Sequence, residues 1–184
     1  MKVFFISFSL VLLLYMVIPG PTKVSDFAHL PDSIKSDLEG DTIQIPNVSA
    51  YFSNNFRDYS TNFYRKEYKS NTWLPILPLR LNHPPEFAFT AIKKHTDSTY
   101  LEEFVYPLRD SLYVNGLEPF YENGDPRYPG ATQFDAGGKS LYTKVTLRYY
   151  PSALWVKLLV WVGIMSSIYL LWHTGKRVLY EDRS

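Results

Sequence analysis

The chain has 184 residues, of which 46% are hydrophobic and 17% aromatic, a composition too apolar for a disordered protein. Its 19 Lys and Arg residues nearly balance its 18 Asp and Glu residues, and the resulting net charge of +1 argues against a general nucleic-acid binder. Cysteine is absent, which excludes disulfides, thiolate catalysis and cysteine-ligated metal sites.

An uncharged apolar segment, residues 3–18, follows Lys2 and is ended by a Pro-Gly-Pro sequence at residues 19–21. Such a segment is either a cleaved signal peptide or a retained anchor. Residues 17–21 have bulky residues and prolines where cleavage requires small side chains, so we expect residues 1–18 to remain as an N-terminal transmembrane anchor or uncleaved signal. As a helix the segment spans about 24 Å, which is short for a hydrocarbon core of roughly 30 Å.

A longer apolar segment occupies residues 152–172, enough for about 32 Å of helix. Its one charged residue, Lys157, lies near the start, and Trp155 and Trp172 lie close to the two ends, as in the aromatic belts of membrane proteins. We predict a transmembrane helix here, followed by a short cytoplasmic tail at residues 173–184.

The short flanks of the two apolar segments predict the topology. Lys2 precedes the first segment, and Lys176 and Arg177 follow the second, so the positive-inside rule places both termini in the cytoplasm. The sequence therefore predicts a two-span protein of the cell membrane, in contact with membrane lipids, whose central residues lie outside.

The central part divides by composition. Residues 19–41 are polar and are expected to form a stalk, whereas residues 42–151 are rich in aromatics and are expected to form an extracytoplasmic α+β domain of short helices and β-hairpins. The first helix is predicted over residues 49–69. There Ser49 is a potential N-cap, and aromatic residues recur at helical spacing as Phe52, Phe56, Tyr59 and Phe63.

Prolines and capping patterns predict the next elements. Residues 73–81 contain Pro75 and Pro78 and should be extended, as an edge strand or polyproline-like segment. A helix should begin at residues 83–86 and run to about Lys94. The spacing of Thr99 and Glu102 matches a capping box, which predicts a short helix to Tyr106.

Two β-hairpins are predicted in the last third of the domain. Asn115-Gly116 has the signature of a tight hairpin turn. Residues 131–135 and 141–150 should pair through a Gly-Gly-Lys turn at residues 137–139, and the second of these strands alternates in polarity. Its expected buried face consists of Leu141, Thr143, Val145, Leu147 and Tyr149.

The chain contains none of the nucleophile-elbow, zinc-protease or phosphate-loop motifs. The candidate catalytic residues are Glu102, Glu103, Arg109 and Asp110, although a structural salt bridge between Arg109 and one of the two glutamates is the favoured interpretation. The candidate binding residues are Arg80, Asn82, His83, Glu86, Tyr100 and Tyr106, where polar and aromatic residues are most densely mixed. No cofactor is predicted, and no metal site, because the helix expected between His83 and His95 would hold them about 18 Å apart.

The leading functional hypothesis is a non-enzymatic, membrane-anchored accessory or assembly subunit that docks on a protein partner in a larger envelope or membrane complex. One alternative is an envelope enzyme acting on a lipid-linked or cell-wall polymer, and another is a tethered sugar- or peptide-binding module. An enzyme should have a deep pocket with convergent carboxylate or histidine side chains, whereas a docking subunit should have an exposed apolar patch.

Overall fold

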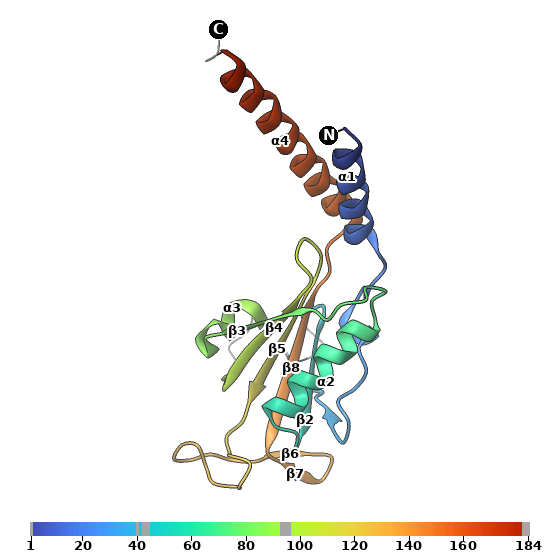
Figure 1. The fold of residues 1–184 in the computed structure, drawn as a ribbon. Helices are drawn as coiled ribbons and strands as arrows, with labels where there is room; N and C mark the ends of the chain where they lie inside the picture. Colours follow the sequence, from blue (N-terminus) through green and yellow to red (C-terminus); the bar gives the residue numbers. More distant parts are fainter. Residues whose placement is uncertain (1, 40, 42–44, 93–96, 182–184) are drawn as a thin grey trace. The chain divides into compact units, whose positions relative to one another are not determined.

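The computed structural model describes residues 2–39, 41, 45–92 and 97–181 (Figure 1). The chain is an α+β protein with an antiparallel sheet, as the sequence predicts. It divides into two compact units: residues 1–18 together with 152–184, and residues 19–151. The first unit is helical, and the second, called here the domain, holds the sheet.

The helical unit consists of α1 (Lys2–Val17) and α4 (Leu154–Glu181). Within it the indole Nε1 of Trp161 donates a hydrogen bond of 3.0 Å to the carbonyl oxygen of Ser9. Among the described residues, Leu154–Val178 is the one helix long and apolar enough to cross a membrane, and the apolar helix Val3–Val17 is shorter. The residues expected to form a tail continue α4 as far as Glu181, and no proline interrupts them.

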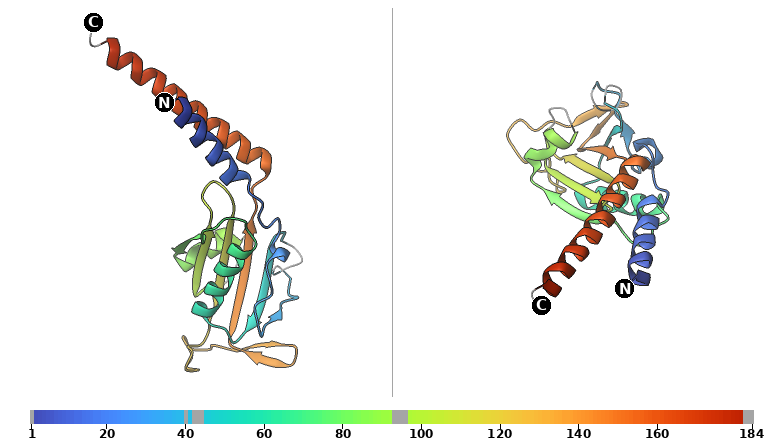
Figure 2. Two further views of the ribbon diagram at one scale, coloured as in Figure 1. Left: turned by 45° about the vertical axis from the view of Figure 1, so that its right-hand side comes forward. Right: turned by 90° about the horizontal axis from the view of Figure 1, so that it is seen from above.

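The main sheet of the domain has six strands in the order β1-β2-β8-β5-β4-β3, and every neighbouring pair is antiparallel (Figure 2). The strands are β1 (Ile34–Lys35), β2 (Val48–Ser53), β3 (Leu79–His83), β4 (Tyr100–Val105), β5 (Ser111–Leu117) and β8 (Thr143–Tyr150). A separate two-stranded sheet is formed by β6 (Phe134–Ala136) and β7 (Lys139–Leu141). The long strands β5 and β8 therefore lie in the middle, and β3 forms one edge.

Helix α2 (Arg57–Ser70) covers one face of the sheet. The helix expected at residues 49–69 therefore begins later than predicted, at Arg57. Residues Val48–Ser53 form β2 instead, with all six side chains buried, because they pair along their whole length with β8. The buried stripe of α2 is consequently different from the expected one. Tyr59 is 49% exposed, and the buried side chains of the helix are Ser60, Thr61, Tyr64 and Tyr68.

The segment at residues 19–41, expected to be a stalk, contributes to the core of the domain. Val24, Phe27 and Leu30 are buried, and the segment includes the 3-10 turn η1 (Val24–Asp26) as well as β1. The ring of Phe27 packs edge-to-face on Tyr68 and Tyr149, with centroid distances of 5.7 and 5.3 Å. Aromatic pairs of this geometry stabilise a core beyond the burial of their area, so the segment is anchored by specific packing.

Two turn and capping predictions in residues 99–117 are wrong. Residues 100–105 form strand β4 rather than a helix, and Asn115-Gly116 lies inside strand β5, where Gly116 pairs with Val145. A Cβ atom on Gly116 would lie 2.0 Å from Cε1 of Tyr100, so glycine is needed there for close packing. The actual turn between β4 and β5 contains Leu108 at a φ of +63°.

The predicted core face of β8 is confirmed. Thr143, Val145, Leu147 and Tyr149 are at most 1% exposed, and the remaining member of the predicted face, Leu141, is 5% exposed. On the other face of β8, Thr146 and Arg148 are also buried, at 4% and 6% exposed. The expected final hairpin is reduced to the short β6–β7 pair. Strand β8 pairs instead with β2 and β5.

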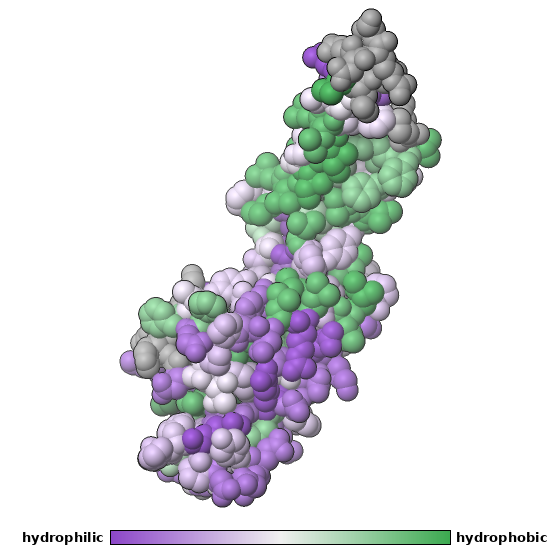
Figure 3. Space-filling model, turned by 60° about the vertical axis from the view of Figure 1, so that its left-hand side comes forward, coloured by the Kyte–Doolittle hydropathy of each residue, from purple (hydrophilic) through white to green (hydrophobic). Residues whose placement is uncertain are grey.

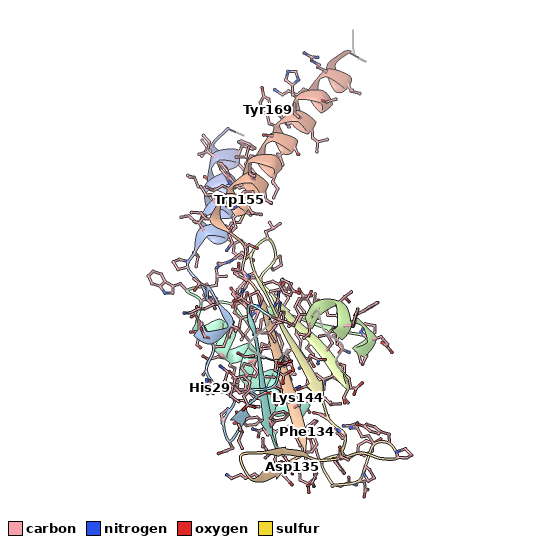
Figure 4. The ribbon with its side chains drawn as sticks, turned by 180° about the vertical axis from the view of Figure 1, so that it is seen from behind. His29, Phe134, Asp135, Lys144, Trp155 and Tyr169 are labelled. Carbon is pink, nitrogen blue, oxygen red and sulfur yellow. The ribbon has the colours of Figure 1, made fainter. Side chains whose placement is uncertain are left out.

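Figure 4 labels Phe134 of β6 and Lys144 of β8, which both contact Phe52 of β2. The ring of Phe134 lies 5.3 Å from the ring of Phe52, measured between centroids. The Nζ atom of Lys144 lies 5.6 Å from the centroid of the Phe52 ring and forms a 2.9 Å ion pair with Asp41. The small sheet is therefore attached through an aromatic contact of strand β2.

Candidate functional site

The strand conformation of β4 separates the two candidate glutamates. Successive side chains of a strand point to opposite faces, so Glu102 faces helix α2 and Glu103 faces the other side of the sheet. The predicted carboxylate pair is adjacent in sequence and does not converge in space. Each glutamate has its own set of partners, and the two sets differ in character.

On the α2 face, Glu102 is fully buried and is neutralised by two arginines. Its Oε1 atom accepts hydrogen bonds from Nε of Arg57 at 2.9 Å and from Nη2 of Arg80 at 2.6 Å. Arg57 also donates to the amide oxygen of Asn82 at 2.9 Å and lies 5.2 Å from the centroid of the Tyr100 ring. The hydrogen bond to Glu102 raises the pKa of Arg80. This cluster, called the Glu102 cluster, has the composition of a structural ion-pair network.

On the opposite face, Glu103 connects three polar side chains. It is 2.9 Å from Nε2 of His83, and its Oε1 atom accepts a 2.6 Å hydrogen bond from the hydroxyl of Ser111. Burial, and next the charge of the neighbouring Glu103, raise the pKa of Tyr113 to about 12. Cross-strand pairing accounts for this grouping, because Glu103 stands directly opposite Tyr113 in the β4–β5 ladder.

His83, Ser111 and Tyr113 line a pocket of about 440 Å³ on this face of the sheet. The 3-10 turn η2 (Pro85–Phe87) and the short helix α3 (Ala88–Ile92) cover the pocket. The expected end of this helix, near residue 94, lies outside the described residues. Tyr113 and Tyr150 pack edge-to-face at 5.6 Å between centroids. The full lining is His83, Phe87, Thr90, Ala91, Leu101, Ser111, Tyr113 and Tyr150.

The hydroxyl of Ser111 in this pocket is bonded to a carboxylate and not to an imidazole. Activation of a serine requires its hydroxyl to donate to a base such as an imidazole. Here the hydroxyl of Ser111 donates to Glu103, and the same carboxylate is bonded to His83. Glu103 therefore fixes the orientation of both side chains, which present a small polar group and an aromatic ring to the pocket.

Other candidate residues lie outside this pocket. Arg109 and Asp110 are in the β4–β5 turn, where Nε of Arg109 lies 3.8 Å from the Asp110 carboxylate. The favoured salt bridge from Arg109 to a glutamate is therefore wrong, because Arg57 and Arg80 occupy Glu102 and His83 pairs with Glu103. The hydroxyl of Tyr106 donates to the carbonyl of Ile76, and Glu86 is exposed on η2.

The predicted site residues did not include Arg57 of the Glu102 cluster, nor Ser111, Tyr113 and Tyr150 of the pocket. The alternation of residues 111–117 could have identified Ser111 and Tyr113 as one face of a strand, had Asn115-Gly116 not indicated a turn. No local signal links Arg57 to Glu102, because 45 residues separate them in sequence. Within the described residues, no group of three His, Asp or Glu side chains is placed to hold a metal ion.

The edge strand β3 presents an exposed apolar surface beside the pocket. Among the strands that the structure describes, β3 pairs with β4 alone, and Leu79 and Leu81 are 54% and 43% exposed. Phe87 and Phe89, in the adjoining turn and helix, are also more than half exposed. We call these four residues the β3 edge patch. Figure 3 shows hydrophobic residues gathered in patches on an otherwise largely hydrophilic face of the domain.

No protein-family model, curated protein or solved structure matches this chain.

Proposed function

We propose that the protein is a membrane-anchored accessory subunit whose domain docks an extended segment of a partner protein along strand β3. The single observation that carries the proposal is the β3 edge patch, a strand edge that pairs with no second strand among the described residues and has two exposed leucines with two exposed phenylalanines beside them. Folded proteins usually protect such edges with charges, bulges or covering elements. An exposed apolar edge is therefore a natural place for a partner to bind.

Strand addition explains how the edge and the pocket would act together. A peptide added to β3 would gain main-chain hydrogen bonds, and its alternate side chains would lie beside Leu79, Leu81 and His83 on the pocket side of the sheet. His83 belongs both to β3 and to the pocket lining. One partner side chain entering the pocket would then meet the polar groups held by Glu103, which supplies specificity.

The anchoring part of the proposal rests on helix α4 and on charge. Its apolar stretch Leu154–Val178 is long enough to span a bilayer, and α1 would provide a second, shorter membrane segment. Lys2, Lys176 and Arg177 are cationic flanks, which favour cytoplasmic termini. The domain at residues 19–151 would then lie on the outer side of the cell membrane, where it could meet an envelope or membrane complex.

The enzyme alternative has less support. Glycoside chemistry requires two carboxyl groups flanking one bond, and the carboxylates of Glu102 and Glu103 lie on opposite faces of the sheet. The pocket is lined by His83, which pairs with Glu103, and this favours a tethered sugar- or peptide-binding module as the second candidate. That candidate differs from the first in placing the ligand in the pocket without contact to the β3 edge.

A comparison of two exposed apolar residues tests the proposal. Leu81 on β3 and Tyr59 on α2 are similarly exposed, so replacing each with Asp should preserve the fold. We expect the full-length protein, extracted in mild detergent, to retain a stoichiometric partner in wild-type and Y59D forms and to lose it in the L81D form. Mass spectrometry of the purified complexes measures this. A wild-type protein without a stoichiometric partner, or L81D retaining it fully, would overturn the proposal.

A further inference from the structure

A second group of exposed apolar side chains lies away from the β3 edge patch. Trp73 is 82% exposed, and Ile76, Leu77 and Leu108 are each about half exposed, at 55%, 49% and 48%. Trp73, Ile76 and Leu77 belong to the loop between α2 and β3, and Leu108 lies at the tip of the β4–β5 turn. We call these four residues the loop cluster.

Hydrogen bonds join the two loops to each other. The hydroxyl of Tyr106 donates to the carbonyl oxygen of Ile76 at 2.9 Å and lies 3.3 Å from the hydroxyl of Thr72. Tyr106 is 1% exposed, so it links the base of the β4–β5 turn to the α2–β3 loop from inside the domain. The four apolar side chains are therefore presented by a fixed backbone arrangement.

Both segments by which the chain enters and leaves the domain lie at the same end as these loops. A Cβ atom on Gly20 would be 3.3 Å from both Arg109 and Thr72, which places the entering segment against the two loops. The leaving segment follows Tyr150, which stands opposite Ser111, directly after the β4–β5 turn. The loops that carry the loop cluster thus lie at the end of the domain where the chain enters and leaves.

Chain length limits how far this end can be from the start of the candidate span. Four residue steps separate Tyr150 from Leu154, the first residue of α4, and an extended chain covers about 14 Å in that distance. The entering segment begins at Pro19, directly after the apolar residues of the N-terminal helix. In a protein anchored by α4, the end of the domain with the loop cluster must lie within this reach of the bilayer.

We propose that the loop cluster contacts the lipid bilayer and inserts its side chains into the interfacial region. Tryptophan is favoured at the boundary between headgroups and hydrocarbon, and Ile76, Leu77 and Leu108 add apolar surface beside it. The occupant of this surface is lipid, whereas the β3 edge patch binds protein. This inference rests on the proposed membrane anchoring through α4, and it assigns the α2–β3 loop a role that the docking function does not require.

The absence of cysteine from the chain permits a direct test in the full-length protein. Single cysteines are introduced as Trp73→Cys, Leu77→Cys and Leu108→Cys, with Asn123→Cys in the exposed β5–β6 loop as the matched control. Each is labelled with a polarity-sensitive fluorophore and reconstituted into phosphatidylcholine and phosphatidylglycerol vesicles, with and without spin-labelled lipid. We expect blue-shifted emission and lipid-dependent quenching at residues 73, 77 and 108, and neither at residue 123.

The outcomes separate this inference from the anchoring on which it rests. Resistance of the protein to alkaline carbonate extraction reports anchoring alone. Resistance combined with water-like emission and iodide quenching at residues 73 and 77 would overturn the lipid contact and leave the anchoring intact. A third outcome is that, in native membranes, the labels at residues 73, 77 and 108 are quenched by neither iodide nor spin-labelled lipid. That result would indicate that a protein covers the loop cluster and would also overturn the lipid contact. Unchanged thermal unfolding of the labelled variants shows that the fold is retained.

Discussion

The two faces of the main sheet use the same kinds of residues in opposite ways. On the face covered by α2, Tyr64, Tyr68 and Leu147 are fully buried, and the buried carboxylate of Glu102 is paired with two arginines. On the face partly covered by α3, Glu103 holds His83 and Ser111 at the wall of an open pocket. The first arrangement stabilises the fold, and the second presents groups that a ligand or partner can reach.

The difference shows that neighbouring residues of the same type need not share a role. Glu102 and Glu103 are identical in chemistry and consecutive in sequence, but the strand places one in the closed face and the other in the open face. A carboxylate in the closed face must be matched by cationic partners, because an isolated buried charge is strongly unfavourable. We therefore expect substitutions on the closed face to reduce stability and those on the open face to reduce binding.

The largest effect should come from a charge in the closed face. Leu147 is fully buried in the central strand β8, so Leu147→Asp places an unpaired carboxylate in the core and should destabilise the protein by about 5 kcal/mol, enough to unfold a marginal domain. Leu81→Asp on the exposed edge should cost only about 1 kcal/mol, chiefly because the new carboxylate stands opposite Glu103. Chemical denaturation of the full-length protein in detergent measures both. Equal destabilisation by the two variants would contradict the distinction between the faces.

The second prediction compares the two glutamates directly. Glu102→Gln leaves Arg57 and Arg80 without their charged partner and should cost about 3 kcal/mol, near the lower end for a buried pair because both arginines also reach solvent. Glu103→Gln weakens hydrogen bonds to His83 and Ser111 and should cost about 1 kcal/mol. The unfolding free energies of the two variants provide the test. The account fails at this point if Glu103→Gln proves the more destabilising change.

The smallest effect concerns pH and Tyr113. Its pKa in the folded protein is raised to about 12 by burial and by Glu103, from an ordinary value of 10.0. A raised folded-state pKa means that its contribution to stability is fully present below pH 10 and is lost as pH rises from about 10 to 12. Because the ring is partly exposed, the loss should be about 1 kcal/mol. The difference in unfolding free energy between wild type and Tyr113→Phe should therefore decrease over this range. A constant difference would show that the pKa of Tyr113 is not raised in the folded protein.

Part of the fold could be predicted from local pattern. The apolar segment that forms α4 is continuous, residues 143–149 alternate strictly, and Pro84 and Pro85 mark the start of a helical segment, so each signal lies within the element it predicts. Of the segment expected to be extended at residues 73–81, the last three residues belong to strand β3, which begins at Leu79. These elements are determined largely by their own residues.

The errors arose where distant residues decide the conformation. Phe52 and Phe56 happen to continue the spacing of Tyr59 and Phe63, which imitates a helix, but pairing with β8 makes residues 48–53 a strand. The ring of Tyr100 explains glycine at position 116 better than a turn does. Both errors, a strand read as a helix and a glycine read as a turn, also affected the prediction of the candidate site. The sequence correctly indicated residues 80–83 and 102–103 as a polar region, but reading residues 99–106 as a helix concealed the separation of Glu102 from Glu103.

Site-specific photo-crosslinking tests most directly the claim that the β3 edge is the docking surface. A photoreactive amino acid is placed at position 81 or, as the matched control, at position 59 on α2, and the full-length protein is irradiated in its native membrane. We predict a covalent adduct with one protein of discrete mass from position 81 and none from position 59, because Leu81 lies on the unpaired edge and Tyr59 on the outer side of α2. An adduct from position 59 without one from position 81 would contradict the account.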